Sequence, residues 1–164
     1  MRAQLRQRGF TLLELIIVVA IIAILAAVSY SGIMSVFPYY HLRAEARELA
    51  INFKKAKIEA VKRNRDVVIL FVDAVAGVQN GSYRIFVNMD RIVPRTIDAG
   101  DILLVNKQIR ANVQLVSNFS NEQAGYDPRG LPIQPANENA VLSTNDGSRS
   151  LTLSVSLVGN VRLR

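Results

Sequence analysis

The spacing of apolar positions divides the chain into an apolar N-terminal segment, an amphipathic helix and a strand-rich remainder. Residues 10–37 form a nearly uncharged run in which the only charged side chain is Glu14. A helix over this run spans roughly 42 Å at ~1.5 Å per residue, more than the ~30 Å hydrocarbon core of a bilayer. The stretch from Leu15 to Val28 is strictly apolar, which suits either a signal-peptide core or a membrane helix.

The segment after Pro38 has the period of an amphipathic helix. Its apolar and alanine positions recur at spacings of four and three and form a single stripe: Leu42, Ala46, Leu49, Phe53, Ala56 and Ala60. This helix is predicted to end near Asn64. Joined to the apolar run, it predicts one long N-terminal helix, in which the pair Ser31-Gly32 is a weak point.

The remaining chain reads as short strands separated by turns. Runs rich in Val, Ile, Leu and aromatic residues predict strands at 67–73, 82–88, 101–109 and 112–118, and alternation predicts another at 150–158. Residues 79–81 and 145–148 are hairpin-turn signals, while 119–140, rich in Pro and Gly, is interpreted as a long surface loop with room for one short strand. The predicted fold class is α+β, with the long helix packed on an antiparallel sheet.

Charge and composition limit the kinds of functional site that the chain can contain. The net charge of +7 comes from residues 1–9 and 39–110, since residues 111–164 balance. With no Cys, the chain has neither disulfides nor thiolate metal sites, and its single histidine, His41, is interpreted as a helix or interface residue. The sequence shows no phosphate-binding glycine loop and no metal-loop spacing of acids. We therefore expect no enzymatic activity and no cofactor.

Glu14 requires an explanation, because a charge at the centre of a bilayer costs roughly 2.5–3.5 kcal/mol on insertion scales. An ordinary secretory signal, cut near Ala27-Val28-Ser29, does not account for this carboxylate. A plain uncleaved anchor does not account for it either.

The residues around Glu14 resemble the class III signal of type IV pilins and type II secretion pseudopilins, a basic leader followed by Gly9, Phe10, Thr11, two leucines and Glu14. The resemblance implies that a prepilin peptidase cuts between Gly9 and Phe10 and that the new amine is methylated. It also implies that Glu14 pairs with the N-terminal amine of a neighbouring subunit, which offsets the cost of burying a charge. One departure is Ser31, at a position where many major pilins carry proline.

The implied organisation has three parts: residues 1–9, a leader that is cleaved; residues 10–37, the transmembrane or filament-core helix; and residues 38–164, an amphipathic helix and β-rich head. The segments 43–69, 126–132 and 156–164 narrow the resemblance to the GspH/FimT family of minor pilins and pseudopilins. The expected partners are other pilin or pseudopilin subunits, the prepilin peptidase and the inner membrane. The head is expected on the periplasmic side and, after assembly, in a periplasmic or cell-surface filament.

The predicted function is a structural minor subunit of a type IV pilus or a type II secretion pseudopilus. Two alternatives stay open: a major filament subunit, and a pilus-tip subunit that binds DNA during uptake. The second rests on basic side chains that could contact phosphates: Lys54, Lys55, Lys57, Lys62, Arg63, Arg162 and Arg164. A solvated helix face is the preferred interpretation of the cluster at 54–65, because its basic positions are spread around the helix and aromatic stacking partners are lacking. In the C-terminal tail, Asn160 replaces the first Arg of the Gly-Arg-x-Arg pattern found in DNA-associated members of the resembled family.

Overall fold

The computed structural model describes residues 10–34, 36–75, 80–89, 97–134 and 138–164, and the side chains of 28–34 are not described. Contacts divide the chain into two units, one ending at Phe37 and one from Pro38 to Arg164. The leader 1–9, including Gly9, and part of the turn signal at 79–81 lie outside the described residues.

The first unit contains one helix, α1 (Leu12–Met34), which continues through Ser31 and Gly32 without ending. The uninterrupted N-terminal helix that the sequence predicted is instead two helices, α1 and α2 (Phe37–Arg63). Pro38 explains the interruption, because it has no N–H to donate to the carbonyl of Met34 and is tolerated in the first turn of a helix. Among the described helices, none combines the length and the apolarity needed to cross a membrane.

The second unit packs α2 on β-strands through the predicted stripe. All six predicted stripe residues are fully buried. The helix ends with Asn64 in the left-handed region, at φ 52°. The N–H of Asn64 donates to the carbonyl of Val61, and the N–H of Arg65 donates to that of Ala60, which together form a Schellman cap. The predicted end of the helix near Asn64 is confirmed.

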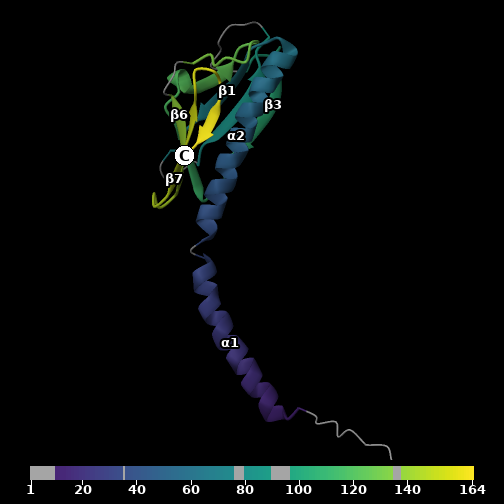
Figure 1. Cartoon of the computed structure of the whole chain (residues 1–164), viewed down its shortest axis with the longest axis vertical. Helices are drawn as coiled ribbons and strands as arrows, with labels where there is room; N and C mark the ends of the chain where they lie inside the picture. Colours follow the sequence, from purple (N-terminus) through teal and green to yellow (C-terminus); the bar gives the residue numbers. More distant parts are fainter. Residues whose placement is uncertain (1–9, 35, 76–79, 90–96, 135–137) are drawn as a thin grey trace, which may run out of the picture. The chain divides into compact units, whose positions relative to one another are not determined.

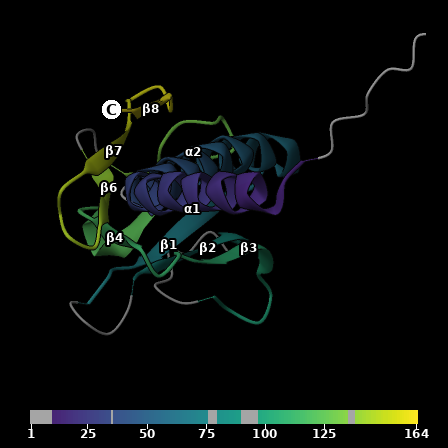
Figure 2. The ribbon, with the colours of Figure 1, turned by 90° about the horizontal axis from the view of Figure 1, so that it is seen from below.

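The strands form two antiparallel four-stranded sheets rather than the single sheet expected, in the orders β3-β2-β1-β5 and β4-β6-β7-β8. In Figure 2, β1, β2 and β3 lie on one side of α2, and β6, β7 and β8 lie on another. The strand bounds are β1 Val67–Val72, β2 Ser82–Val87, β3 Ile102–Gln108, β4 Val113–Ser117, β5 Gln123–Tyr126, β6 Asn139–Thr144, β7 Ser150–Val155 and β8 Val161–Leu163. Figure 1 shows α2 running along the strands of the head. The predicted α+β class is confirmed.

The segment 119–140, predicted as a surface loop with room for one short strand, contains the strand β5 and the first two residues of β6. β5 pairs with β1 and is buried at all four positions, whereas a surface segment was expected. Gly125 permits this burial, since a Cβ there would lie 2.6 Å from the carbonyl oxygen of Val67. The local Pro and Gly content marks turns correctly but does not reveal that the strand between them closes one edge of a sheet.

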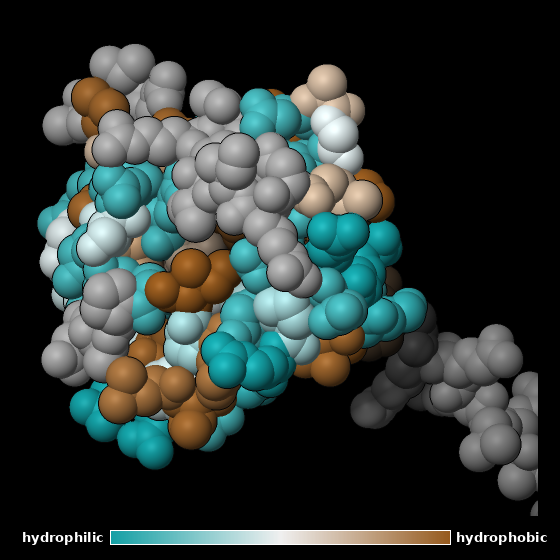
Figure 3. All heavy atoms as spheres, turned by 90° about the horizontal axis from the view of Figure 1, so that it is seen from above, coloured by the Kyte–Doolittle hydropathy of each residue, from teal (hydrophilic) through white to brown (hydrophobic). Residues whose placement is uncertain are grey.

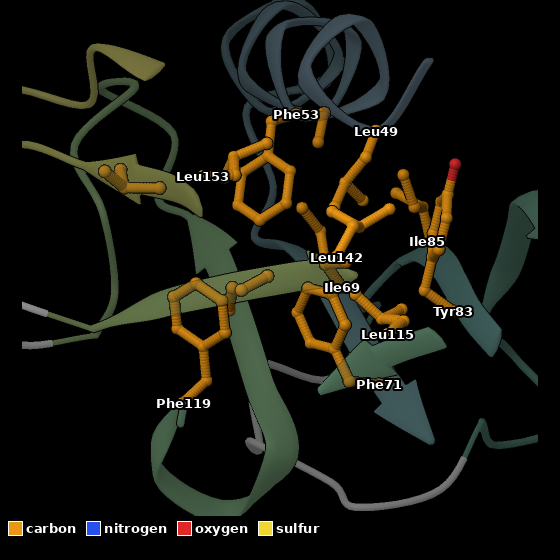
Figure 4. Packing of buried hydrophobic residues seen from close by; sticks show 14 of the residues in the cluster. Leu49, Phe53, Ile69, Phe71, Tyr83, Ile85, Leu115, Phe119, Leu142 and Leu153 are labelled. Carbon is orange, nitrogen blue, oxygen red and sulfur yellow. The ribbon is translucent and has the colours of Figure 1, made fainter. Parts of the chain in front are cut away.

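The core lies between α2 and the two sheets and is rich in aromatic rings. The ring centroid of Phe53 on α2 lies 6.2 Å from that of Phe71 on β1 and 6.1 Å from that of Phe119. The ring of Tyr126 meets Phe53 edge-on, with 6.5 Å between the centroids. Figure 4 shows Leu49 and Phe53 directed from the helix toward residues of both sheets. One helix thus joins two sheets that have no strand in common.

Candidate functional site

The candidate assembly site lies at the start of α1, where the first helical turn is capped. Phe10 is 83% exposed and precedes the helix by two residues. The backbone N–H of Glu14 donates to Oγ1 of Thr11 at 3.2 Å, which places Thr11 at the N-cap and Glu14 at the third helical position. Thr-x-x-Glu is the sequence of a capping box. The chain therefore presents a carboxylate in the first turn of a helix that begins immediately after the predicted cleavage point.

From Leu15 to Ala27, α1 is apolar around its whole circumference. Every described side chain from Phe10 to Ala27 is exposed, and Glu14 is the only charged residue in the helix. A helix that is apolar on all sides needs an apolar environment on all sides. Packing against a bundle of like helices would supply such an environment.

The basic residues of α2 do not form one surface. Lys54, Lys55 and Lys62 are exposed. The guanidinium of Arg63 pairs with Glu59 at 2.6 Å, and this hydrogen bond holds the pKa of Glu59 below its usual value. Arg63, one of the residues named as a possible DNA contact, is thus paired with a carboxylate of its own helix.

The fold does bring part of the helix cluster to the C-terminal arginines. A hollow of about 510 Å³ between α2 and the C-terminal segment is lined by Lys54, Lys57 and Arg162, together with Ile58, Gly159, Asn160 and Val161. A second hollow of about 470 Å³ contains both Arg162 and Arg164 beside hydroxyl and amide side chains of β6 and β7. Arg162 belongs to both hollows.

Lys57 has a structural role that the sequence did not indicate. Its Nζ donates to the carbonyl oxygen of Val158 at 3.0 Å, across about a hundred residues of sequence. Gly130 and Gly159 both have positive φ. A Cβ atom at either glycine would lie 3.1 Å from the side chain of Lys57. We call this contact between Lys57, the 127–131 loop and the 156–160 turn the loop junction. The two glycines were the only sequence signal for it.

The other residues at the loop junction hold its two loops in place. Oδ1 of Asp127 accepts hydrogen bonds from the backbone N–H groups of Arg129 and Leu131, both at 2.9 Å. Although partial burial opposes it, these bonds and the Arg129 side chain lower the pKa of Asp127. Burial raises the pKa of the Tyr126 hydroxyl. The segment from Tyr126 to Gly130 is therefore anchored to the head at both ends, since Tyr126 and Gly130 are buried.

Replacing Gly159 with alanine is expected to destabilise the head by about 2–4 kcal/mol, since a left-handed φ of 76° combines with overpacking. A Cβ at this position would lie 2.8 Å from the carbonyl oxygen of Gly130. The matched control is Gly147→Ala in the β6–β7 turn, where φ is 67° but the space is open, and the expected cost is about 1 kcal/mol. Urea unfolding of both variants measures the difference, and equal costs would contradict a tight junction.

A buried carboxylate on α2 is also structural. Glu45 is 2% exposed, and its two oxygens lie 3.0 Å from Nε of Arg110 and 3.6 Å from Nζ of Lys107. A hydrogen bond to Glu48, followed by the field of Glu45, raises the pKa of Lys107. These pairs connect α2 to β3 and to the turn after it. In the described ranges, no group of three or more His, Cys, Asp or Glu side chains is arranged to hold a metal ion.

A capped apolar helix at the N-terminus, followed by a helix packed on antiparallel sheets, is the architecture of the pilin class. The sequence matches the prokaryotic N-terminal methylation motif over residues 4–30 and the family described as type II transport protein GspH over residues 45–159. The chain belongs to the GspH family. Membership makes it a structural minor pilin or pseudopilin subunit of a type IV pilus or type II secretion system, not an enzyme. It implies assembly with other pilins and processing by a prepilin peptidase.

Named relatives agree with this membership. The pilin-like protein PilA1 of Thermus thermophilus is 28% identical over 155 residues, which cover 90% of this chain and 94% of the relative. The structure resembles the type IV minor pilin FimU of Pseudomonas aeruginosa with a TM-score of 0.54 and 20% identity, over 75% of this chain and 92% of FimU. It resembles the minor pseudopilin EpsH from the type 2 secretion system of Vibrio cholerae with a TM-score of 0.52 and 11% identity, over 76% and 96% of the two chains. These two structures support the fold.

Proposed function

We propose that the chain is cut between Gly9 and Phe10, methylated on the new amine, and held in the inner membrane by its N-terminal segment with the head in the periplasm. From there it enters a type IV pilus or a type II secretion pseudopilus. The observation that carries this proposal is the apolar circumference of α1 with a single carboxylate in its first turn. A packed bundle of such helices buries every apolar side chain and leaves only that charge to be neutralised.

The neutralising group in this proposal is the N-terminal amine of an adjacent subunit. After cleavage, the positive amine of Phe10 lies four residues before Glu14 and directly ahead of the helix. An unpaired carboxylate in an apolar bundle is costly, whereas opposite charges in low dielectric attract strongly. Each subunit offers one amine and one carboxylate, so the pairing can repeat from one subunit to the next along a filament.

The processing step is tested by intact mass and N-terminal sequencing of the chain co-expressed with a prepilin peptidase. The expected product begins at N-methylated Phe10. A product cut after Ser29 would contradict the proposal, because it would identify an ordinary secretory signal that removes Glu14 and the apolar run.

DNA capture is a second candidate function, supported by the hollow that Arg162 and Arg164 share. That hollow also carries Asn139, Thr152 and Ser154, and hydroxyl and amide groups beside arginine suit phosphate oxygens. Within the described part of the chain, neither arginine has an ion-pair partner.

The DNA hypothesis predicts duplex binding by the mature chain in detergent, with affinity that falls steeply as salt rises. The double substitution Arg162→Ala, Arg164→Ala should weaken binding about tenfold and reduce the salt dependence, as expected when two phosphate contacts are lost. The control is Arg63→Ala, which removes an arginine already paired with Glu59. Equal affinity in all three proteins would exclude this hollow as a DNA site.

A further inference from the structure

An exposed apolar patch surrounds the loop junction. Five large aliphatic side chains from three segments contribute to it: Ile58 (65% exposed), Val61 (52%), Leu131 (37%), Leu157 (72%) and Val158 (60%). We call this set the junction patch. Single exposed apolar residues are ordinary on protein surfaces, whereas a contiguous group of them marks an interaction site.

The three segments of the junction patch are in contact beneath it. A Cβ at Gly130, the residue before Leu131, would lie 3.2 Å from Cγ2 of Val61. A Cβ at Gly159, the residue after Val158, would lie 2.8 Å from the carbonyl oxygen of Gly130. With the hydrogen bond from Lys57 to Val158, these contacts fix the two loops against α2. The junction patch is therefore one surface, held by the same contacts that close the head.

The position of Leu157 and Val158 is unusual for aliphatic residues. They lie in the turn between β7 and β8, which is closed by a hydrogen bond from the N–H of Ser156 to Asn160 and one from Gly159 to Ser156. Turns favour Gly, Asn, Asp and Ser, which suit their backbone and stay hydrated. Two large aliphatic side chains at a turn gain little from the fold of their own chain, so their burial requires another molecule.

The charges beside the junction patch are positive. The hollow at its edge is lined by Ile58 together with Lys54 and Arg162, and no carboxylate is among its described lining residues. The nearest acids on the same segments are already paired, Glu59 with Arg63 and Asp127 with Arg129. On the face viewed in Figure 3, hydrophobic and hydrophilic side chains lie side by side. Charge complementarity favours an acidic partner.

We propose that the junction patch binds an acidic, apolar segment of a neighbouring pilin or pseudopilin subunit in the filament. The proposal rests on the proposed function, because it takes the partner to be a filament subunit. Apolar side chains of that segment cover Ile58, Leu157 and Val158, and its carboxylates meet Lys54 and Arg162, an arrangement with an apolar centre and a charged rim. Nucleic acid fits this surface less well, because aliphatic side chains offer no ring on which bases stack.

The test places a photo-crosslinking benzophenone amino acid at Leu157 of the full chain in its native filament and maps the crosslinked peptide by mass spectrometry. The expected adduct is with another subunit, at a segment that contains Asp or Glu. Double substitutions of the apolar pair, Ile58→Ser with Val158→Ser, and of the charged pair, Lys54→Glu with Arg162→Glu, should each lower the adduct yield about tenfold or more. The matched control is Ile102→Ser, since Ile102 lies on β3 in the other sheet with 41% exposure, and its effect should stay within about twofold.

Three results would overturn the proposal: an adduct unaffected by either double substitution, an adduct at a segment without carboxylates, or no subunit adduct at all. Duplex DNA and phosphatidylglycerol, each added to the mature chain in detergent micelles, provide the alternative occupants. Binding of either one that depends on Ile58 and Val158, without a subunit adduct, would assign the junction patch to that occupant instead. The N-terminal mass of each variant is measured in parallel. Loss of N-methylated Phe10 would count against the processing step of the proposed function rather than against the junction patch.

Discussion

Replacing Glu14 with glutamine is expected to leave the chain cleaved, methylated and inserted in the membrane but to exclude it from filaments. Glutamine keeps the shape of the side chain and is accepted at this position of a capping box, so the start of α1 is preserved. Only the charge is lost. Breaking a buried ion pair costs about 3–5 kcal/mol, which corresponds to roughly a hundredfold or greater fall in incorporation.

The measurement is the amount of variant that co-purifies with sheared filaments, divided by the amount in the inner membrane. Thr11→Ala is the matched control, because it removes the cap hydrogen bond to the N–H of Glu14 while keeping the carboxylate. Its expected cost of about 1 kcal/mol changes incorporation by no more than about tenfold. If the Glu14→Gln variant enters filaments as well as the parent does, the pairing between carboxylate and amine is excluded.

Replacing Phe53 with alanine is expected to produce the largest loss of stability in the head, about 3–5 kcal/mol. Phe53 is fully buried and its ring meets those of Phe71, Phe119 and Tyr126. Its removal opens a cavity between α2 and both sheets at once. Total stabilities of domains are only about 5–15 kcal/mol, so a loss of this size leaves a substantial unfolded fraction under mild denaturation.

Urea unfolding of the mature chain in mild detergent, followed by near-ultraviolet circular dichroism, measures this loss through the aromatic core. Ile51→Ala is the control, since Ile51 is on the same helix but 63% exposed, and its expected effect is within about 0.5 kcal/mol. Equal midpoints for the two variants would mean that the aromatic cluster does not hold the helix on the sheets.

Much of this protein was predictable because the relevant signals are local in the chain. The capped start of α1 depends on Thr11 and Glu14, which are three residues apart. The stripe of α2 follows from its period of three and four, and the predicted residues are the buried ones. The C-cap at Asn64 is equally local. Hydrogen-bonding geometry and side-chain direction within one helix are enough to fix these features.

Other features depend on residues that are distant in sequence and have no local signature. Three such features are the division into two sheets, the burial of β5 in a segment where only a short surface strand was allowed for, and the pairing of Glu45 with Arg110. A short strand is read from its residues, but its partner is not, because pairing register depends on which faces are buried.

By itself, the sequence determined an apolar N-terminal helix with one carboxylate in its first turn, a helix with one buried stripe, and a strand-rich head. Only the tertiary structure decided that Lys57 binds the turn after β7, that Arg162 joins Lys54 at one hollow, and that five aliphatic residues form one exposed surface. The physical reason is that side-chain periodicity reports which face of an element is buried, whereas contacts between elements arise only when long-range packing closes the chain on itself.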